Sequence, residues 1–263
     1  MASKICVLSI AGSDSGSGAG IQSDIKTFKN HGVYGLSAIT AVTAQNTRGV
    51  QSSLSMPARV IDSQLNSIFD DFKVRAAKTG MLARPNVIQV IAKHVKRQKG
   101  LKLVVDPVIY SKNGFTMLNR AGIKSLKKDL LPLTYLLTPN IPEAEILTGL
   151  SIETIEDLET AAVMLRDMGA KNVLVKGGHL KNSVGLPLGT DVLFDGSKFY
   201  LFNTNYISTA NTHGIGCTLS AAITSNIAKG YRLEKAIDLA KAYVVRSLIR
   251  TVKLGKGFNP VEQ

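Results

Sequence analysis

The sequence predicts an α/β fold: a mostly parallel central sheet with helices covering both of its faces. Short aliphatic runs alternate with longer segments of helical periodicity along the whole chain, and this alternation is typical of strand–helix–strand units. The runs are aliphatic throughout, as expected for strands buried on both faces. The chain has 263 residues and neither an internal repeat nor a low-complexity linker, so we expect a single domain.

In the first half of the chain, the expected elements follow from apolar spacing and from the residues that end each run. An aliphatic run at 5–10 gives way to glycine and serine, which predicts a strand followed by a loop. Ile21, Ile25 and Phe28 recur at helical spacing, so a helix is expected over 21–30. The same criteria predict helices at 60–72 and 86–99 and strands at 34–42, 74–79 and 101–105.

The second half continues the alternation and closes with two helices. Thr154 is a candidate N-cap, and Gly169 a stop, for a helix at 155–168. An Asp-Gly turn between apolar runs predicts a β-hairpin of strands 192–194 and 199–202. The other expected elements are helices at 121–130, 216–229 and 233–251 and strands at 135–137 and 173–175.

The chain is strongly basic, with 32 Lys and Arg against 19 Asp and Glu and a formal net charge of +13. Either a nucleic-acid-binding protein or an enzyme acting on anionic substrates would fit this charge. The basic residues gather at 93–99 and 124–128, on expected helices, with aliphatic rather than aromatic residues between them. This pattern is typical of a solvated helix face, so we expect no nucleic-acid partner.

The two cysteines, Cys6 and Cys217, are too few for a disulfide framework and fit a reducing cytoplasm. Cys6 falls in the first expected strand and is expected to pack in the core. No apolar segment approaches the ~20 residues of a membrane-spanning helix, and the N-terminus lacks a signal-peptide pattern. We therefore expect a cytoplasmic protein with no membrane partner.

A glycine-rich segment at 12–20 follows the first expected strand. Its spacing does not match a dinucleotide-binding fingerprint, because Gly16 and Gly18 lack a third glycine three residues on, where Ile21 stands. A Walker-type phosphate loop is excluded as well, since no glycine in the chain is followed by Lys and then Ser or Thr. Two interpretations remain: a ligand approaches the backbone here, or the segment is only a flexible turn.

Polar residues directly follow several expected strands, and ligands bind at the carboxyl ends of parallel strands. Asp106 could contact a metal ion or its water, or serve as a turn carboxylate. Asn140 and Glu143 have the spacing of a capping box, but the same geometry points an amide and a carboxylate at the sheet edge. Lys176, followed by two glycines, could reach a phosphate or belong to a simple turn.

The segment 211–217, Asn-Thr-His-Gly-Ile-Gly-Cys, leads into an apolar helix. A glycine-rich turn that opens a helix leaves backbone N–H groups unpaired at the positive end of the helix dipole. It therefore attracts an anion, typically a phosphate. We expect Cys217, placed at such a helix start, to have a lowered pKa.

The order of these segments resembles that of the ribokinase superfamily, and more narrowly that of the hydroxymethylpyrimidine/phosphomethylpyrimidine kinases of thiamine biosynthesis. The matching blocks cover nearly the whole chain: 11–16, 18–24, 26–28, 43–47, 78–82, 105–108, 138–145, 176–179 and 212–218. The last block is specific, because most of the superfamily has aspartate where Cys217 stands. The resemblance implies a ribokinase-like three-layer α/β/α sandwich and a homodimer.

The resemblance also implies roles for particular residues. The pyrimidine pocket would be lined by Gly12, Asp24, Gln45, Met81 and Val108, with Gln45 hydrogen-bonded to the aminopyrimidine edge. Mg²⁺ would be organised, largely through water, by Asp106 and Glu143. ATP would be bound by Asn140, Lys176, Thr212 and Lys241. An anion hole beside Cys217 would be formed by the N–H groups of Gly214, Ile215 and Gly216.

The implied reaction transfers the γ-phosphoryl group of ATP to a primary alcohol and then to the resulting monophosphate. Phosphoryl transfer depends mainly on alignment and charge neutralisation, so a weak base suffices for the alcohol. We expect Cys217 to be that base. It should be dispensable in the second step, because there the nucleophile is already a phosphate anion.

Two other functions are compatible with parts of the sequence. Pyridoxal kinases related to this family have the same cysteine-bearing loop, although Gln45 within Thr-Ala-Gln-Asn-Thr favours the pyrimidine. A basic nucleic-acid-binding protein is supported by net charge alone. The C-terminal segment 257–263 departs from relatives that end in a Pro-x-Asn-His segment, which leaves the role of this tail open.

Overall fold

The computed structural model describes residues 4–111, 113–178, 189–204, 212–250 and 253–263. Its centre is a nine-stranded sheet with the spatial order β3-β2-β1-β4-β5-β6-β7-β8-β9. The strands are β1 (Cys6–Asp14), β2 (Tyr34–Asn46), β3 (Gly49–Ser55), β4 (Val74–Thr79), β5 (Lys102–Val105), β6 (Leu136–Leu137), β7 (Asn172–Val175), β8 (Asp191–Phe194) and β9 (Phe199–Phe202). The helices are α1 (Gly20–Asn30), α2 (Ala58–Asp71), α3 (Pro85–Arg97), α4 (Arg120–Ser125), α5 (Ile141–Thr148), α6 (Ile155–Asp167), α7 (Ile215–Ala228) and α8 (Leu233–Ile249).

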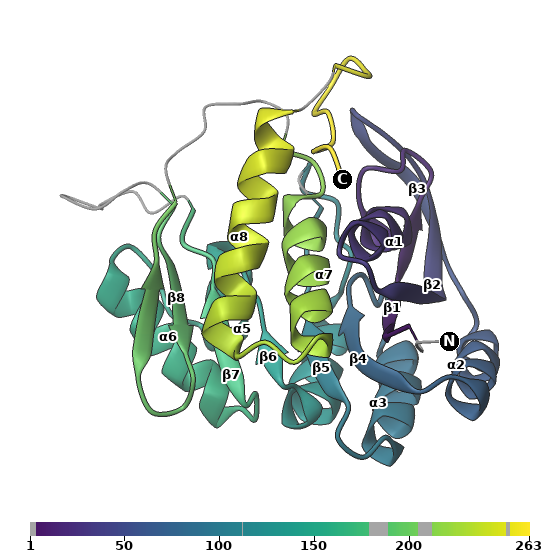
Figure 1. Cartoon of the computed structure of the whole chain (residues 1–263), viewed down its shortest axis with the longest axis horizontal. Coiled ribbons are helices and arrows are strands. Elements are labelled where there is room, and N and C mark those ends of the chain that lie inside the picture. The colour runs from purple at the N-terminus through teal and green to yellow at the C-terminus, as the bar shows by residue number, and fades with distance from the viewer. Residues whose placement is uncertain (1–3, 112, 179–188, 205–211, 251–252) are drawn as a thin grey trace.

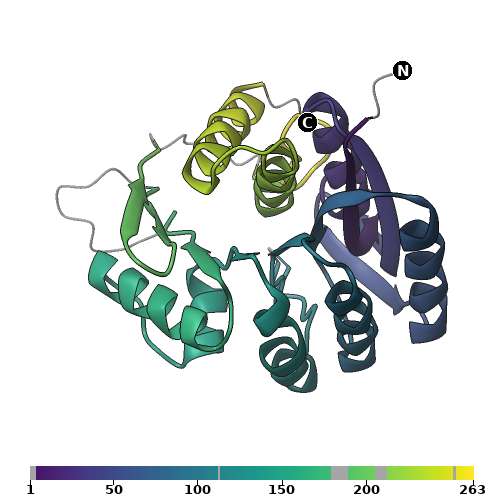
Figure 2. The same cartoon turned by 60° about the horizontal axis from the view of Figure 1, so that its bottom comes forward.

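Helices form the two outer layers of a three-layer sandwich. Helices α1, α7 and α8 lie on one face of the sheet, and α2, α3, α5 and α6 lie on the other (Figures 1 and 2). Neighbouring strands from β2 to β7 are parallel, whereas β3, β8 and β9 join antiparallel at the two edges. The prediction of an α/β/α sandwich with a mostly parallel central sheet is confirmed.

Each face of the sheet has its own apolar core, and this explains why central strands such as β5 are mostly aliphatic. Successive side chains of a strand point to opposite faces. In β5, Leu103 packs with α2 and α3 residues such as Leu65 and Ile88. Its neighbour Val104 packs instead with Ile223 of α7. Leu103 and Val104 are both fully buried.

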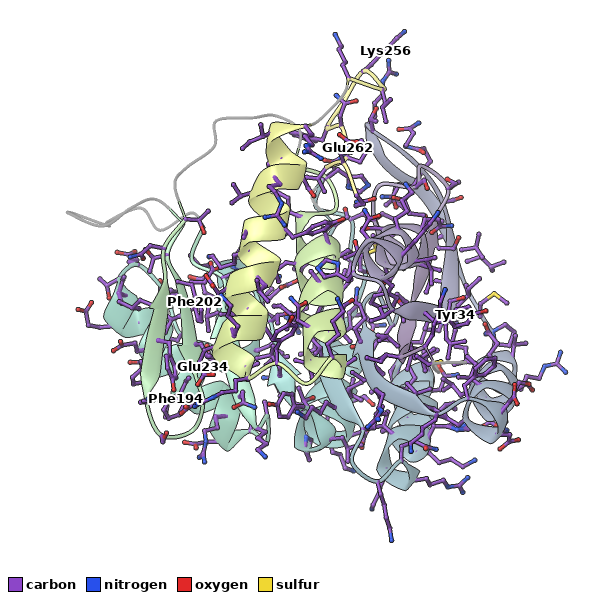
Figure 3. All side chains as sticks on the ribbon, in the orientation of Figure 1. Tyr34, Phe194, Phe202, Glu234, Lys256 and Glu262 are labelled. Carbon is purple, nitrogen blue, oxygen red and sulfur yellow. The ribbon has the colours of Figure 1, made fainter. Side chains whose placement is uncertain are left out.

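Labelled side chains in Figure 3 show where the two edges of the sheet and the C-terminal segment lie. Tyr34, at the start of β2, lies toward one lateral edge of the sheet, and Phe194 and Phe202 of the β8–β9 hairpin lie toward the other edge (Figure 3). Lys256 and Glu262 lie on the C-terminal segment, beyond the end of α8 (Figure 3). No helix in the described ranges has both the length and the apolarity needed to cross a bilayer.

Most expected elements are present, with ends that shift by a few residues. Strand β3 was not predicted, because its residues Gln51, Ser52 and Ser53 are exposed and polar and therefore give no aliphatic run. It also did not extend the capping pattern at Asn140 into the short helix α5. Only the first part of the helix expected at 121–130 is α-helical. The α-helix α4 ends at Ser125, and residues 126–130 form a wider helical turn. His179, Asn211 and Thr251, which belong to predicted segments, lie outside the described residues.

Candidate active site

The predicted site residues gather around one cavity of about 820 Å³ at the carboxyl ends of the parallel strands. Loops that follow five of these strands, together with the start of α7, form its walls. All predicted site residues except Asp24 line it: Gly12, Gln45, Met81, Asp106, Val108, Asn140, Glu143, Lys176, Thr212, Gly214, Ile215, Gly216, Cys217 and Lys241. The predicted residues from eight separate segments therefore lie on one contiguous surface.

Asp24 does not line the cavity, so its expected place in the pyrimidine pocket is wrong. Its side chain is fully buried between α1 and the sheet, where Lys78 Nζ donates to both carboxylate oxygens at 2.8 and 3.0 Å. The Ser9 hydroxyl donates to the same carboxylate. Burial lowers the pKa of Lys78, but the carboxylate of Asp24 and the other acidic groups nearby together raise it by more, so the net pKa of Lys78 is above its usual value. Burial also raises the pKa of Asp24, while the charge of Lys78 lowers it in part. The sequence could not show this pairing, because the partners are 54 residues apart.

The start of α7 has the backbone geometry of an anion site. Gly214 precedes the helix with φ +83°, and a Cβ at this position would overlap the carbonyl oxygen of Gly18. Only glycine therefore fits both the conformation and the space. A Cβ on Gly216 would lie 3.5 Å from Asp106 Oδ2 and from Lys176 Nζ. The first N–H groups of an α-helix have no partner within the helix, and here they open beside these charged side chains.

Cys217 lies in the first turn of α7 and borders the cavity, but its thiol is not acidic. Burial raises the pKa of Cys217 to about 11, although the positive charge of Lys78 lowers it in part. The predicted lowering of this pKa is therefore wrong. The helix dipole, which carries about half a charge, and the buried ammonium together do not offset the loss of water around the sulfur.

Asp106, Glu143 and Lys176 form a charged group at the ends of β5, β6 and β7. Lys176 Nζ donates to Asp106 Oδ1 at 3.2 Å. Glu143 Oε2 accepts from the Asn140 backbone N–H at 2.9 Å, and Oε1 accepts from the Ile109 N–H at 3.3 Å. Burial and the charge of Asp106 raise the pKa of Glu143, while Lys176 lowers it in part. Asn140 and Glu143 form a capping box and also border the cavity. The same two residues therefore cap α5 and lie at the sheet edge, which the sequence had left as alternatives.

Two further polar residues border the same end of the cavity. Lys241 of α8 donates to Asp191 and, at 3.0 Å, to the Phe202 carbonyl oxygen. The Thr212 hydroxyl is buried, and no hydrogen-bond partner is found for it among the residues that the structure describes. A buried hydroxyl without a partner is costly, so this group is suited to bind a ligand.

The opposite end of the cavity is apolar. Met81 packs with Ala41 and Met117, and Val108 lies against this cluster. Val108 has φ +38°, which is unusual for a β-branched residue and costs on the order of 1–3 kcal/mol. The amide of Gln45 provides a polar group beside these side chains. Such a surface suits a flat ring with hydrogen-bonding groups on its edge.

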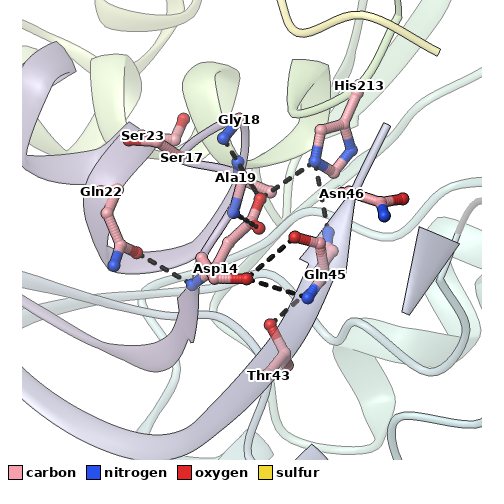
Figure 4. A network of polar contacts seen from close by, with 12 residues as sticks. Asp14, Ser17, Gly18, Ala19, Gln22, Ser23, Thr43, Gln45, Asn46 and His213 are labelled. Atoms are coloured by element: carbon pink, nitrogen blue, oxygen red, sulfur yellow. Dashed lines mark hydrogen bonds and ion pairs between the residues drawn. The ribbon is translucent and has the colours of Figure 1, made fainter. Parts of the chain in front are cut away.

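No specific role for Asp14 or for His213 follows from the sequence. The Asp14 carboxylate accepts backbone hydrogen bonds from Gly16 at 2.8 Å, Ala19 at 2.9 Å and Gly18 at 3.2 Å. His213 Nε2 lies 3.0 Å from Asp14 Oδ2 (Figure 4). A carboxylate inside a glycine-rich loop was the only sequence signal for this role.

The C-terminal segment is tied to the start of α7. The His213 N–H donates to the Asn259 carbonyl at 3.2 Å, and the Val261 N–H donates to the His213 carbonyl at 3.1 Å. Gln263 Nε2 donates to the carbonyl oxygen of Gly18 at 3.1 Å. The tail, whose role the sequence left open, thus connects the glycine-rich loop to the anion site.

Comparison with known proteins finds relatives that match nearly the whole chain. A family model described as phosphomethylpyrimidine kinase matches residues 14–262. The hydroxymethylpyrimidine/phosphomethylpyrimidine kinase of Bacillus subtilis is 43% identical over 253 residues, which are 96% of this chain and 92% of that protein. The thiamine biosynthesis bifunctional protein of Geobacter sulfurreducens is 45% identical over 97% of this chain, which spans 51% of that longer protein.

Among solved structures, the pyridoxal kinase of Staphylococcus aureus in complex with AMP-PCP and pyridoxal is similar to this chain with a TM-score of 0.89. The match covers 99% of this chain and 94% of that one, at 32% identity. Shape alone therefore does not separate the two kinds of vitamin kinase, whereas sequence identity favours the first. The family match over nearly all of the chain shows that the protein belongs to the phosphomethylpyrimidine kinase family.

Proposed function

We propose that the protein is an ATP-dependent kinase that phosphorylates 4-amino-5-hydroxymethyl-2-methylpyrimidine and then converts the monophosphate to the diphosphate in thiamine biosynthesis. One observation carries this proposal: a single cavity joins an apolar ring subsite at Gln45 and Met81 to a phosphate subsite at the start of α7. The similarity to the hydroxymethylpyrimidine/phosphomethylpyrimidine kinase of Bacillus subtilis and to a thiamine biosynthesis protein supports the same substrates.

The phosphate subsite has the groups that phosphoryl transfer requires. The transition state spreads negative charge over equatorial oxygens, so catalysis depends on positioning and on fixed positive groups. The N–H groups of Gly214, Ile215 and Gly216 would bind that charge at the start of α7. Asn140, Lys176, Thr212 and Lys241 would bind the nucleotide from the other side.

Mg²⁺ fits the two carboxylates of the phosphate subsite. Magnesium prefers oxygen ligands and is usually held by one or two carboxylates, with water and phosphate oxygens completing its shell. Asp106 and Glu143 would hold the ion, largely through water, because Glu143 already accepts two backbone hydrogen bonds. The described residues contain no group of three or more His, Cys, Asp or Glu side chains placed to hold a metal ion by themselves. When bound with ATP, the ion would neutralise phosphate charge.

Cys217 would lie at the hydroxymethyl end of the ring substrate. Its pKa of about 11 keeps it mostly a thiol at neutral pH, and only the small thiolate fraction can take up the alcohol proton as that proton leaves. A loose transition state asks little of such a base. The monophosphate needs no base, because it is already an anion.

Pyridoxal kinase is the second candidate, favoured by the overall similarity to the Staphylococcus aureus enzyme. The decisive experiment measures ATP consumption with the hydroxymethylpyrimidine, its monophosphate and pyridoxal in parallel. The proposal expects the highest kcat/KM for the two pyrimidines. A preference for pyridoxal would replace the proposed function by the second candidate.

We also propose a homodimer in the cytoplasm with no nucleic-acid or membrane partner. Val42 of β2 and Leu54 of the edge strand β3 lie opposite each other and are 46% and 70% exposed. A second copy covering this pair would remove apolar surface from water. Light scattering measures the subunit number, and a salt-dependent gel shift with DNA or RNA would contradict the absence of a nucleic-acid partner.

A further inference from the structure

His213 lies between an acidic side chain and an amide at the cavity wall. Its Nε2 atom is 3.0 Å from Asp14 Oδ2 and 3.3 Å from Gln45 Nε2 (Figure 4). Burial raises the pKa of Asp14, but hydrogen bonds from His213 and from backbone N–H groups lower it by more, and its net pKa is below the usual value. Asp14 is therefore a carboxylate that only accepts hydrogen bonds, and His213 Nε2 must carry the proton that lies between them.

This proton conflicts with an amide nitrogen at the second contact. An Nε2–H of His213 and the NH₂ group of Gln45 are both donors, and two donors facing each other at 3.3 Å repel. Thr43 presents a second conflict. Its single hydroxyl proton faces the Ser13 carbonyl oxygen at 3.0 Å and Gln45 Oε1 at 3.2 Å, and it can bond fully to only one of them.

One rotation of the Gln45 amide by half a turn removes both conflicts. The amide oxygen then shares the His213 Nε2–H proton with Asp14 Oδ2 in a three-centre hydrogen bond. The NH₂ group donates to Thr43 Oγ1, whose own proton bonds to Ser13. Amide oxygen and nitrogen have nearly the same shape, so the hydrogen-bond network decides between them. We infer that the Asp14–His213 pair fixes this orientation of the Gln45 amide, and that His213 is a positioning residue that selects the ring substrate through Gln45.

The backbone of Gln45 cannot shift to escape this constraint. Its N–H donates to Ser15 Oγ at 2.9 Å, and its carbonyl accepts from the same hydroxyl at 2.8 Å. The residue is thus held to the glycine-rich loop while its side chain is held by His213 and Thr43. The order of acceptor and donor that the amide offers to the cavity is therefore fixed before a ligand binds.

The fixed order favours one class of ring. An aminopyrimidine presents an amino donor next to a ring-nitrogen acceptor. A primary amide pairs with both groups when its oxygen faces the amino group and its NH₂ faces the ring nitrogen. The same bidentate pairing lets glutamine recognise adenine. The ring of pyridoxal has no amino group and lacks this pair. This consequence rests on the proposed function, whereas the amide orientation does not.

Steady-state kinetics of His213→Leu tests the selection. The loss of one hydrogen bond that orients Gln45 should raise the KM for the hydroxymethylpyrimidine about tenfold. The KM for ATP should stay unchanged, and the pyrimidine-to-pyridoxal ratio of kcat/KM should fall about tenfold. An unchanged ratio overturns the inference.

The chain offers a matched control in a second histidine–aspartate pair. His94 of α3 is buried, lies 2.8 Å from Asp62 and does not line the cavity. His94→Leu removes the same kind of contact and should leave both KM values and the substrate ratio unchanged. An equal change in both variants would show a general effect on folding and overturn the inference.

Neutron diffraction from crystals of the deuterated protein tests the orientation without any assay. The expected result is a deuteron on His213 Nε2 and two deuterons on the Gln45 amide atom that faces Thr43. Deuterons on the amide atom facing His213 overturn the inference, even if the enzyme prefers the pyrimidine. A wild-type enzyme that is inactive on the pyrimidine would contradict the proposed function. The neutron measurement would still decide the orientation of the Gln45 amide, because it does not depend on activity.

Discussion

Lys176 Nζ lies 3.2 Å from Asp106 Oδ1, at the point where the first turn of α7 meets the ends of β5 and β7. The carboxylate of Asp106 raises the pKa of Lys176 although burial lowers it, so the lysine stays positively charged. This pair brings a fixed cation and a carboxylate to the anion site, in a position to act on a phosphate and its metal ion.

Replacing Lys176 by methionine removes this cation and leaves Asp106 and Glu143 without a neutralising partner. We expect kcat to fall by ~10²–10³, as when a fixed group that stabilises the transition state is lost. Stopped-flow measurement of the phosphoryl-transfer step checks this. Lys198→Met, at an exposed lysine over the Tyr200 ring, is the matched control. A Lys176→Met enzyme with normal kcat would remove the residue from the phosphate subsite.

The buried Lys78–Asp24 pair should matter for stability and not for substrate binding. Lys78→Met leaves an unpaired buried carboxylate and should lower the free energy of unfolding by about 3–5 kcal/mol, measured in urea. The double variant Lys78→Met/Asp24→Leu removes both charges and should recover most of the loss. Asp24→Asn should leave the KM for the ring substrate unchanged. A large rise in that KM with normal stability would show that Asp24 takes part in binding the ring substrate.

Cys217→Ala should separate the two phosphorylations. The alcohol of the first substrate loses a proton, whereas the monophosphate is already an anion. We expect the first single-turnover rate to fall by ~10²-fold, near the lower end of the range for general bases, and the second to change little. Rapid quench with labelled ATP measures both rates. Equal losses in the two steps would assign Cys217 to packing of the helix start.

The raised pKa of Cys217 also predicts how stability depends on pH. Burial moves this pKa from 9.0 to about 11, so the folded state holds the thiol proton more tightly than the unfolded state does. The contribution to stability is complete below pH 9 and is lost as pH rises through about 11. Urea titrations at several pH values should show that Cys217→Ala loses less stability than wild type between these limits. Parallel curves would contradict the raised pKa.

Gly214 and Gly230 allow the crowding at the anion site to be separated from backbone strain. Both have positive φ, +83° and +91°, but a Cβ on Gly230 meets nothing within 4 Å, whereas one on Gly214 overlaps the Gly18 carbonyl. Gly214→Ala should therefore displace the first turn of α7 and reduce kcat by ~10²-fold or more. Gly230→Ala should cost only on the order of 1 kcal/mol of stability. Similar activities in the two variants would contradict the placement of the donors.

Local patterns predicted the strands of the sheet other than β3, together with the charged and glycine-rich segments of the cavity, whereas the residues of the ring subsite were expected only from the family resemblance. The aliphatic run at 101–105 indicated a strand buried on both faces, and the residue that follows it, Asp106, had to emerge at the sheet edge. The Asn140–Glu143 spacing indicated the capping box that the structure contains. These features depend on neighbours within a few residues, which the sequence displays directly.

Tertiary structure alone decided which charges meet and how much water surrounds them. Asp24 was expected at the ring and is instead paired with Lys78, and the pKa of Cys217 is raised where a lowered value was expected. The contact of Asp14 with His213 joins residues 199 positions apart. Burial and long-range pairing depend on how distant segments pack, and a helix dipole visible in the sequence is weaker than the desolvation that packing imposes. The sequence thus determined the fold and the order of the site residues, and packing determined their partners and protonation.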